Sequence, residues 1–296
     1  MGARRRALGA AVLIYLGVAG LFSLFVWQAS GRADARLDLF GGRVAIVEVE
    51  GIILDVDDLL RDLKDFRDNP SVRAVVVRIN SPGGVVGPTQ EVHNSLVKLR
   101  EAGKPVVASL GSIAASGGYY IAVAADRIYA NPGTLTGSIG VIMQMPNVDG
   151  LLKKVGVDYV VIKAGQYKDL GNFARPMRPD ERQVLQALLD DVHGQFIDAV
   201  AAGRKITREQ VVAFADGRIF SGVQAKAHSM IDALGGLEDA VNAAGTLAGL
   251  KVPPRTITPR RRTSIINLIR SQLGLPGALL ATPRLPVFQT PLYLMP

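Results

Sequence analysis

Short runs of apolar, often β-branched residues recur along the chain and alternate with segments in which apolar residues return every three or four positions. The short runs predict buried strands at 43–53, 72–79, 106–110 and 159–162. The periodic segments predict helices at 55–70, 88–103, 114–126, 179–202, 207–215 and 236–248. Apolar strands that alternate with helices through short connections are typical of parallel strands covered by helices. We therefore expect an α/β fold.

The first apolar segment is of another kind. No charged residue lies between Arg6 and Arg32, and Ala7–Ala29 is long enough to cross a hydrocarbon core of about 30 Å as a helix. The arginines just before it predict a cytoplasmic N-terminus. The alternative is a cleaved signal peptide with its cleavage site near Ala33–Ala35, although such apolar regions are usually shorter. In both cases the rest of the chain is expected outside the cytoplasm.

These patterns divide the chain into four parts. We expect a membrane anchor at 1–32, a linker at 33–42, a folded domain at 43–250 and a basic arm at 251–296. The arm holds eight of the sixteen prolines, and its apolar pieces are too short to span a membrane. It is either a disordered tail or a segment that docks on a neighbouring subunit or in a substrate cleft.

Charge and composition exclude several classes of function. The net charge is +8, but the excess of arginine and lysine lies in the two terminal parts, which contain no acidic residue, so the middle is slightly acidic. A nucleic-acid-binding domain carries its basic charge on a folded face, so no nucleic-acid partner is expected. The absence of cysteine excludes disulfides and thiolate chemistry. Three scattered histidines make a zinc site unexpected, and no metal or cofactor is predicted.

Candidate chemistry lies where predicted strands end, because ligands of open α/β sheets collect at the carboxyl ends of strands. The strand at 72–79 ends in "INSPGG". Pro82, Gly83 and Gly84 are compatible with an ordinary turn. They are equally compatible with a stretch of bare backbone whose N–H groups face a ligand.

The next strand ends in "GSIAASGGYY", where a helix begins close to Ser116. A serine at the start of a helix is commonly a cap that accepts a hydrogen bond from the helix backbone. Alternatively, Ser116 is a nucleophile whose small neighbours keep its approach open, with the Gly117 N–H directed at the same space.

A nucleophilic serine needs a base. None of His93, His193 and His228 is obviously placed for this role by the sequence, although folding could bring one of them there. Lys168, in the loop "GQYKDLG" after the strand predicted at 159–162, is a second candidate. Most such lysines are solvated surface charges, and a lysine base must be neutral, which burial favours.

Three motifs together, "INSPGG", "AASGGYYIAVAADRIYANPGTLTGSIGVI" and "GQYKDLG", resemble the signal peptide peptidase A family in its short, single-repeat form. The resemblance covers about 43–250. It implies a ClpP/crotonase-like fold of repeated β-β-α units and a Ser/Lys serine protease without a cofactor. It also implies an N-terminal anchor in the inner or plasma membrane, a periplasmic catalytic domain, ring-like self-assembly, and cleavage of signal-peptide remnants and other apolar peptides.

The resemblance also implies roles for single residues. Ser116 matches the nucleophile, Lys168 the general base and Ser138, in "TGSIGV", the serine that positions this lysine. The backbone of Gly83, Gly84 and Gly117 matches the oxyanion hole, with the choice between the first two left open. Three alternatives remain: a related membrane Ser/Lys protease associated with stomatin-like proteins, a crotonase-fold acyl-CoA enzyme and a non-catalytic membrane scaffold.

Overall fold

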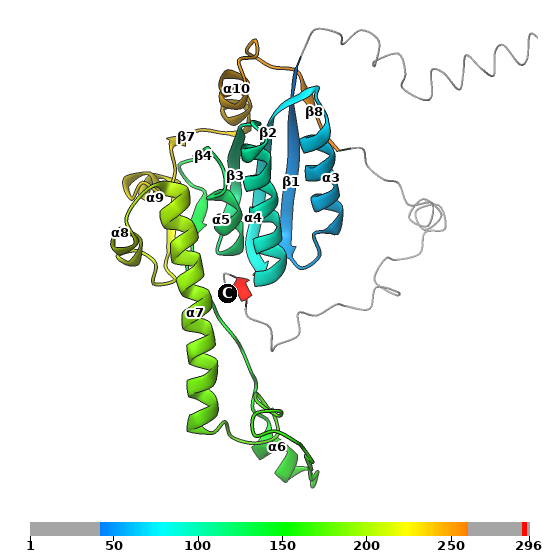
Figure 1. Ribbon diagram of the computed structural model, residues 1–296. Coiled ribbons are helices and arrows are strands. Elements are labelled where there is room, and N and C mark those ends of the chain that lie inside the picture. Colours follow the sequence, from blue (N-terminus) through cyan, green and yellow to red (C-terminus); the bar gives the residue numbers. More distant parts are fainter. Residues whose placement is uncertain (1–41, 260–291, 295–296) are drawn as a thin grey trace, which may run out of the picture. The chain divides into compact units, whose positions relative to one another are not determined.

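The computed structural model describes residues 42–259 and 292–294 (Figure 1). The predicted anchor, most of the linker and most of the arm lie outside these residues. Among the residues described, no helix is both long and apolar enough to cross a membrane.

The described strands form one sheet around three long parallel strands, as the α/β prediction requires. These are β1 (Arg43–Ile53), β2 (Val72–Val85) and β3 (Val106–Ala115), with β2 between the other two. The remaining strands are short: β4 (Arg127–Ala130), β5 (Leu135–Gly137), β6 (Ile219–Ser221), β7 (Ala233–Leu234), β8 (Thr256–Ile257) and β9 (Leu292–Leu294).

Strand β3 has a different partner in each half. Val107–Leu110 pairs in parallel with β4, and Ile113–Ala115 pairs in parallel with β5. The sheet therefore divides along β3: β4 lies beside its first half, and β5 lies beside its second half, which ends directly before Ser116. This mixed sheet with its helices is consistent with the ClpP/crotonase-like fold expected from the resemblance.

Helices cover both faces of the sheet, which explains why Ala74–Val77 in the middle of β2 is an unbroken apolar run. Successive side chains of a strand point to opposite faces. Val75 and Val77 belong to the large core with the first helices, whereas Ala74 and Val76 belong to a smaller core with the last one. The helices are α3 (Asp57–Asp68), α4 (Val86–Glu101), α5 (Gly117–Ala122), α6 (Asp149–Lys154), α7 (Pro179–Arg204), α8 (Arg208–Val212), α9 (Gly222–Ala227) and α10 (Leu237–Leu247).

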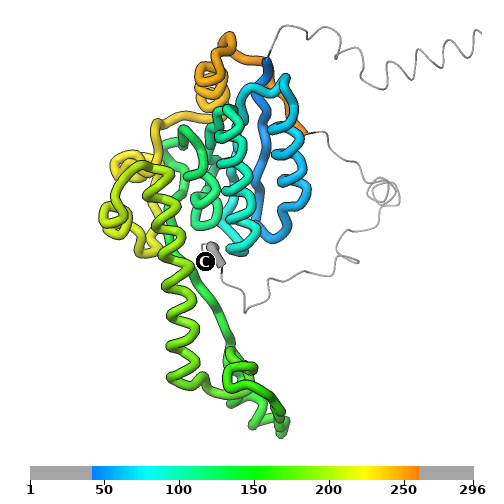
Figure 2. Tube along the Cα trace, viewed as in Figure 1, coloured from blue at the N-terminus to red at the C-terminus, as the bar shows by residue number. Residues whose placement is uncertain are grey.

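Strand β2 departs from the prediction, because it continues through Pro82–Gly84 to Val85 instead of ending near Ile79 in a turn. A second departure concerns the segment before α7. The strand expected at 159–162 does not form, and residues 141–178, which we call the extension, contain no buried residue. The extension includes α6 and lies with the first half of α7 away from the sheet (Figures 1 and 2). An apolar β-branched run predicts burial. Nothing in the described chain supplies it, because Val160 is 80% and Ile162 97% exposed.

Candidate active site

Ser116 occupies the turn between β3 and α5 in a conformation that a side chain rarely adopts. Its φ is 52° and its ψ is −117°, and only 1% of the residue is exposed. Its backbone N–H donates to Gly137 O at 2.8 Å, which continues the pairing of β3 with β5 beyond the end of the strand. Strained backbone of this kind costs about 1–3 kcal/mol and clusters at functional sites.

The Ser116 hydroxyl makes no structural hydrogen bond. Its Oγ is buried and has no partner among the described residues, and it does not cap α5. The capping alternative is therefore wrong. A buried hydroxyl without a partner costs about 1–3 kcal/mol of stability. Packing does not explain why this hydroxyl is kept at a strained position, whereas a role as a nucleophile does.

The glycine-rich end of β2 lies against both β1 and α5. A Cβ atom on Gly84 would lie 2.1 Å from Ile53 O, and one on Gly118 would lie 2.8 Å from Ser81 O. Gly83 has a φ of +108°, in the region that favours glycine. These close approaches place the backbone of Gly83 and Gly84, at the end of β2, beside the start of α5, where Gly117 lies.

The sequence patterns missed Ser81, which fixes this end of β2. Ser81 is fully buried, and its Oγ donates to Gly51 O at 2.6 Å and accepts the Gly83 N–H at 3.1 Å. A serine that ends an apolar strand immediately before a proline was the available signal.

Ser138 lies next to Ser116 through the backbone. It follows Gly137, whose carbonyl accepts the Ser116 N–H, and its own N–H donates to Arg218 O at 2.8 Å. Ser138 is 5% exposed and has a φ of 50°, so it shares both burial and a left-handed backbone with Ser116. The structure thus brings the backbone of two predicted site residues to one place.

Lys168 is not brought to this place within one chain. It lies in a turn of the extension, where its N–H donates to Gly165 O at 3.2 Å, and its side chain is exposed. The extension is at the far end of α7 from the sheet and α5 (Figure 1). The prediction that Lys168 follows a buried strand and is itself buried is wrong for the single chain.

The histidines do not replace Lys168 as a base next to Ser116. The His93 ring packs on Tyr120, with 5.0 Å between centroids, and burial lowers the pKa of His93. His228 packs on Phe220. No hydrogen bond joins a histidine to Ser116 in the described part of the chain.

Part of the arm returns to this site. Strand β9 runs antiparallel to the end of β2 and pairs Gly83 with Leu294, Gly84 with Tyr293 and Val85 with Leu292. It also contacts α4 and α5. At the other end of the described arm, β8 adds to the outer edge of β1. The arm therefore contributes two strands to the sheet.

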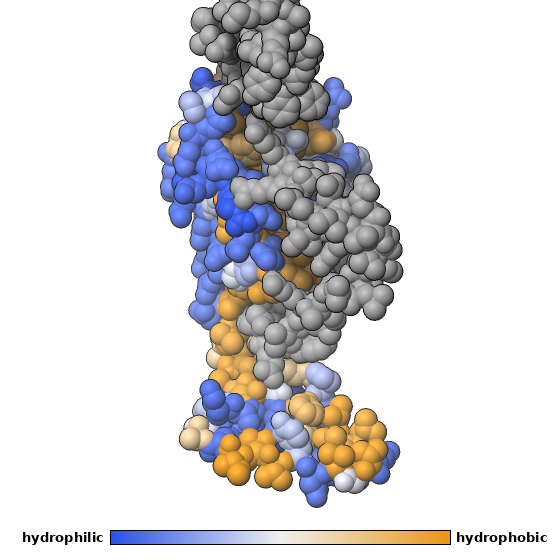
Figure 3. Space-filling model, turned by 90° about the vertical axis from the view of Figure 1, so that its right-hand side faces the viewer, coloured by the Kyte–Doolittle hydropathy of each residue, from blue (hydrophilic) through white to orange (hydrophobic). Residues whose placement is uncertain are grey.

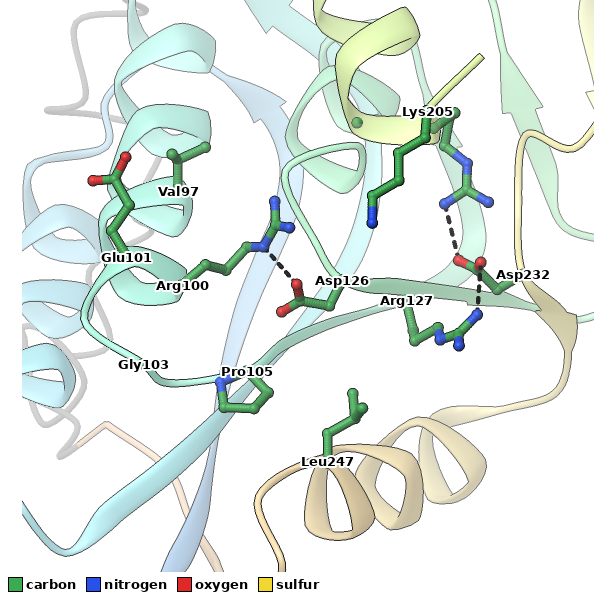
Figure 4. A pocket seen from close by; sticks show the side chains of 12 residues that line it. Val97, Arg100, Glu101, Gly103, Pro105, Asp126, Arg127, Lys205, Asp232 and Leu247 are labelled. Atoms are coloured by element: carbon green, nitrogen blue, oxygen red, sulfur yellow. Dashed lines mark hydrogen bonds and ion pairs between the residues drawn. The ribbon is translucent and has the colours of Figure 1, made fainter.

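A pocket of about 810 Å³ lies at the opposite end of β3, lined by Pro105 and by charged residues (Figure 4). Arg100 pairs with Asp126 at 2.7 Å and Arg204 with Asp232 at 2.9 Å. Both carboxylates also accept backbone N–H groups at the starts of β3 and β4. These ion pairs tie helix ends to the sheet, and the pocket is separate from Ser116.

Comparisons with known proteins agree with this arrangement. Residues 98–251 match the profile of peptidase family S49. The chain is 50% identical over 210 residues to a protein of Synechocystis that carries a protease name, which covers 70% of this chain and 75% of that protein. It is 37% identical over 220 residues to Protease 4 of Salmonella typhi, covering 71% of this chain and 35% of the relative.

A third relative carries the name signal peptide peptidase and comes from Enterococcus faecium. It is 32% identical over 214 residues, which are 68% of this chain and 62% of that protein. The chain therefore spans about a third of Protease 4 and under two thirds of the Enterococcus protein. The matched segment contains the strained serine and the loop of the lysine. The chain belongs to peptidase family S49, as a serine protease of the signal peptide peptidase A type.

Proposed function

We propose that this protein is a membrane-anchored endopeptidase in which Ser116 attacks the carbonyl of an apolar peptide. The observation that carries the proposal is the state of Ser116: buried, strained and with an unpartnered hydroxyl, close to the end of β2 where Gly83 and Gly84 carry no side chains. Family membership supports the reaction class, and the geometry supports the choice of residue.

The oxyanion is stabilised by backbone N–H groups on both sides of Ser116. Gly117 is the first residue of α5, so its N–H has no acceptor within the helix. The Gly83 N–H already donates to Ser81 Oγ, which favours Gly84 as the second donor. Loss of one such donor typically costs about 10²–10³ in rate.

Lys168 acts as the base from a neighbouring copy of the chain. In one chain it lies on the exposed extension, whereas Ser116 Oγ is buried without a partner. The extension carries a group of exposed apolar side chains (Figure 3), among them Leu151, Val155, Tyr159, Val160, Ile162 and Tyr167. Large exposed apolar patches mark interaction surfaces. Docking of this patch on a second copy desolvates the lysine, which favours its neutral form.

The reaction proceeds through an acyl-enzyme. Neutral Lys168 accepts the Ser116 proton as Oγ bonds to the peptide carbonyl carbon, and the carbonyl electron pair moves to the oxygen. Collapse of this intermediate breaks the C–N bond, and the leaving amine takes the proton from Lys168. Water, deprotonated by the same lysine, then releases the acyl group and restores Ser116. Ser138 orients Lys168 through its hydroxyl.

The substrates are signal-peptide remnants and other apolar peptides. Strand β9 supports an extended mode of binding, because it adds antiparallel to the end of β2 at Gly83 and Gly84, where a scissile peptide must lie. The names of the relatives support the class of substrate. The apolar segment Ala7–Ala29 anchors the protein in the membrane with its catalytic domain outside the cytoplasm, and the assembly is a homo-oligomeric ring.

The full-length chain in membrane vesicles, assayed with an apolar peptide, tests the dyad and its origin. Ser116→Ala and Lys168→Ala are each expected to abolish cleavage. When the two variants are co-expressed and pair at random, about a quarter of the sites combine an intact Ser116 from one copy with an intact Lys168 from the other. Co-expression is therefore expected to restore up to about a quarter of wild-type activity. Retained activity in either single variant contradicts the dyad. Absence of restoration by the mixture, with both variants inactive, contradicts a dyad formed between copies.

A further inference from the structure

The extension and the start of α7 are held together without a hydrophobic core. Of residues 140–184, Glu181 is the only buried one, and its side chain is fully inaccessible. A carboxylate is rarely fully buried unless it is paired. The order of this segment, which includes Lys168, therefore depends on what Glu181 binds.

Arg175 is its main partner. The guanidinium donates to Glu181 Oε2 at 2.8 Å and to Oε1 at 2.5 Å, in the two-point geometry that suits a carboxylate. Glu181 also accepts the Arg178 N–H at 2.9 Å, and Arg178 Nη1 lies 3.0 Å from its Oε1. Because Glu181 is in the first turn of α7, these bonds fix Arg175 to the start of a long helix.

The same guanidinium holds the residue that follows Lys168. Arg175 Nη2 and Nε donate to Asp169 Oδ2 at 2.9 and 3.1 Å. Lys163 Nζ also binds Asp169 and donates to Gln166 O at 2.9 Å, so it joins residues on either side of Lys168. A continuous path of ionic hydrogen bonds thus leads from α7 through Arg175 to the side chain of Asp169, the residue next to Lys168.

The same hydrogen bonds lower the pKa of both carboxyls. The hydrogen bonds from Arg175 lower the pKa of Glu181 to about 2, and the hydrogen bond from Lys163, followed by those from Arg175, holds the pKa of Asp169 far below its usual range. Both groups are therefore ionised at any pH at which a neutral lysine base operates. Lys168 itself takes no part in these ion pairs.

We propose that Glu181 is a positioning residue for the reaction, which acts through Arg175 and Asp169 to fix the loop that presents Lys168 to the neighbouring copy. The inference rests on the proposed function of Lys168. It adds a fixed ionic scaffold, remote from the nucleophile, on which the placement of the base depends.

The full-length variants Glu181→Gln and Asp169→Asn test this, with Asp232→Asn as a matched control. Asp232 also binds an arginine and a backbone N–H, but at the opposite end of the sheet from Ser116. Amide hydrogen exchange is expected to quicken at least tenfold at residues 165–172 in the first two variants. The control is expected to change thermal stability without quickening exchange in this loop.

Activity supplies the second measurement. In E181Q we expect kcat for an apolar peptide to fall at least tenfold with KM changed less than twofold. We also expect the acid limb of the pH–rate profile to move to higher pH, because a loosely held lysine spends more time solvated and protonated. The double variant D169N/E181Q is expected to resemble either single one, since both act through Arg175. The control D232N should keep the wild-type pH profile.

Separate outcomes contradict the inference and the proposed function. Wild-type activity that survives Lys168→Ala overturns the dyad, and the role of Glu181 falls with it. If the dyad holds, wild-type exchange in E181Q overturns the inference. So does quickened exchange with an unchanged kcat and pH profile. If E181Q fails to fold, D169N alone decides, because Asp169 lies in the loop and not in the helix.

Discussion

The backbone N–H of Ser116 donates to the carbonyl of Gly137 at 2.8 Å, so the residue after Gly137, Ser138, lies beside Ser116 across β3 and β5. Both serines have a φ near 50° and both are buried. The hydrogen bond holds the strained turn in place from the backbone side. The Ser116 hydroxyl is thereby left available for chemistry.

Two buried serines near the site are expected to respond oppositely to loss of their hydroxyl. Ser116→Ala should leave the free energy of unfolding unchanged or up to about 1 kcal/mol higher, because Ser116 Oγ has no partner to lose. Ser81→Ala should cost about 1–3 kcal/mol, because Ser81 Oγ binds Gly51 O and Gly83 N–H. Urea denaturation measures both. A Ser116→Ala variant destabilised as much as Ser81→Ala would contradict the unpartnered hydroxyl.

Gly84 is expected to tolerate no side chain. A Cβ there would lie 2.1 Å from Ile53 O, so Gly84→Ala must push β1 and β2 apart, at a cost of about 2 kcal/mol or more, and it should also abolish peptide cleavage. Gly87, in the first turn of α4, has open space around a Cβ. Gly87→Ala should therefore be neutral or stabilise by up to about 1 kcal/mol. Thermal unfolding of the two variants compares them directly.

The exposed apolar surface of the extension is expected to be needed for assembly. Ile162→Asp should leave the secondary structure of the single chain intact, because Ile162 is 97% exposed, but should convert the proposed oligomer to monomers without peptidase activity. Val212 on α8 is 54% exposed and provides a matched control, since Val212→Asp should change neither property. Light scattering after size-exclusion chromatography reports the mass. A full-sized assembly of Ile162→Asp would show that another surface joins the copies.

Strand β9 is expected to compete with substrate. It pairs with Gly83–Val85, so deletion of residues 292–296 should free the backbone that an incoming peptide needs and lower KM several-fold with little change in kcat. Deletion of 251–296, which also removes β8, should in addition lower stability by exposing the edge of β1. An unchanged KM after the shorter deletion would assign β9 a structural role.

The extension is expected to lose its order in acid before the sheet does. Glu181 has a pKa lowered from 4.5 to about 2, so its ion pairs contribute their full stability above about pH 4.5 and lose it as the pH falls towards 2. Hydrogen exchange at residues 163–181 should quicken over this range, while the central strands stay protected. E181Q should show the quickened exchange already at neutral pH, with a much weaker dependence on acid.

The central fold was predictable because burial leaves a regular trace in sequence. The alternation of Val75 and Val77 with Val76 between two cores requires apolar residues at consecutive positions, and the resulting run Ala74–Val77 is easily recognised. Strands of two to four residues, such as β4 and β5, carry too few positions for a period to show. The run at 159–162 was wrongly predicted to be a buried strand for a different reason. An apolar run indicates that a segment becomes buried, but it does not identify the surface that covers the segment.

The candidate site was predictable in parts. The motifs located Ser116, Ser138 and the Gly83–Gly84 pair, and the structure brings these residues together, with the two glycines in a strand and not in the expected turn. The relation of Lys168 to Ser116 was not predictable, because strand order alone suggested a shared sheet edge, whereas the lysine lies on the extension. The ion pairs of Arg175 with Asp169 and Glu181 also left no periodic signal. From sequence alone, a charged residue is predicted to be exposed to solvent unless its ionic partner is known.

The exposed stretch around Val160 and Ile162 has a consequence for cleavage of the protein by other copies of itself. It is extended, apolar and accessible, and so resembles the peptides that the protein is proposed to cut. A lone copy would be a good substrate for an assembled one. Burial of this stretch in the assembly would therefore protect assembled copies from cleavage and leave unassembled copies open to degradation by assembled ones.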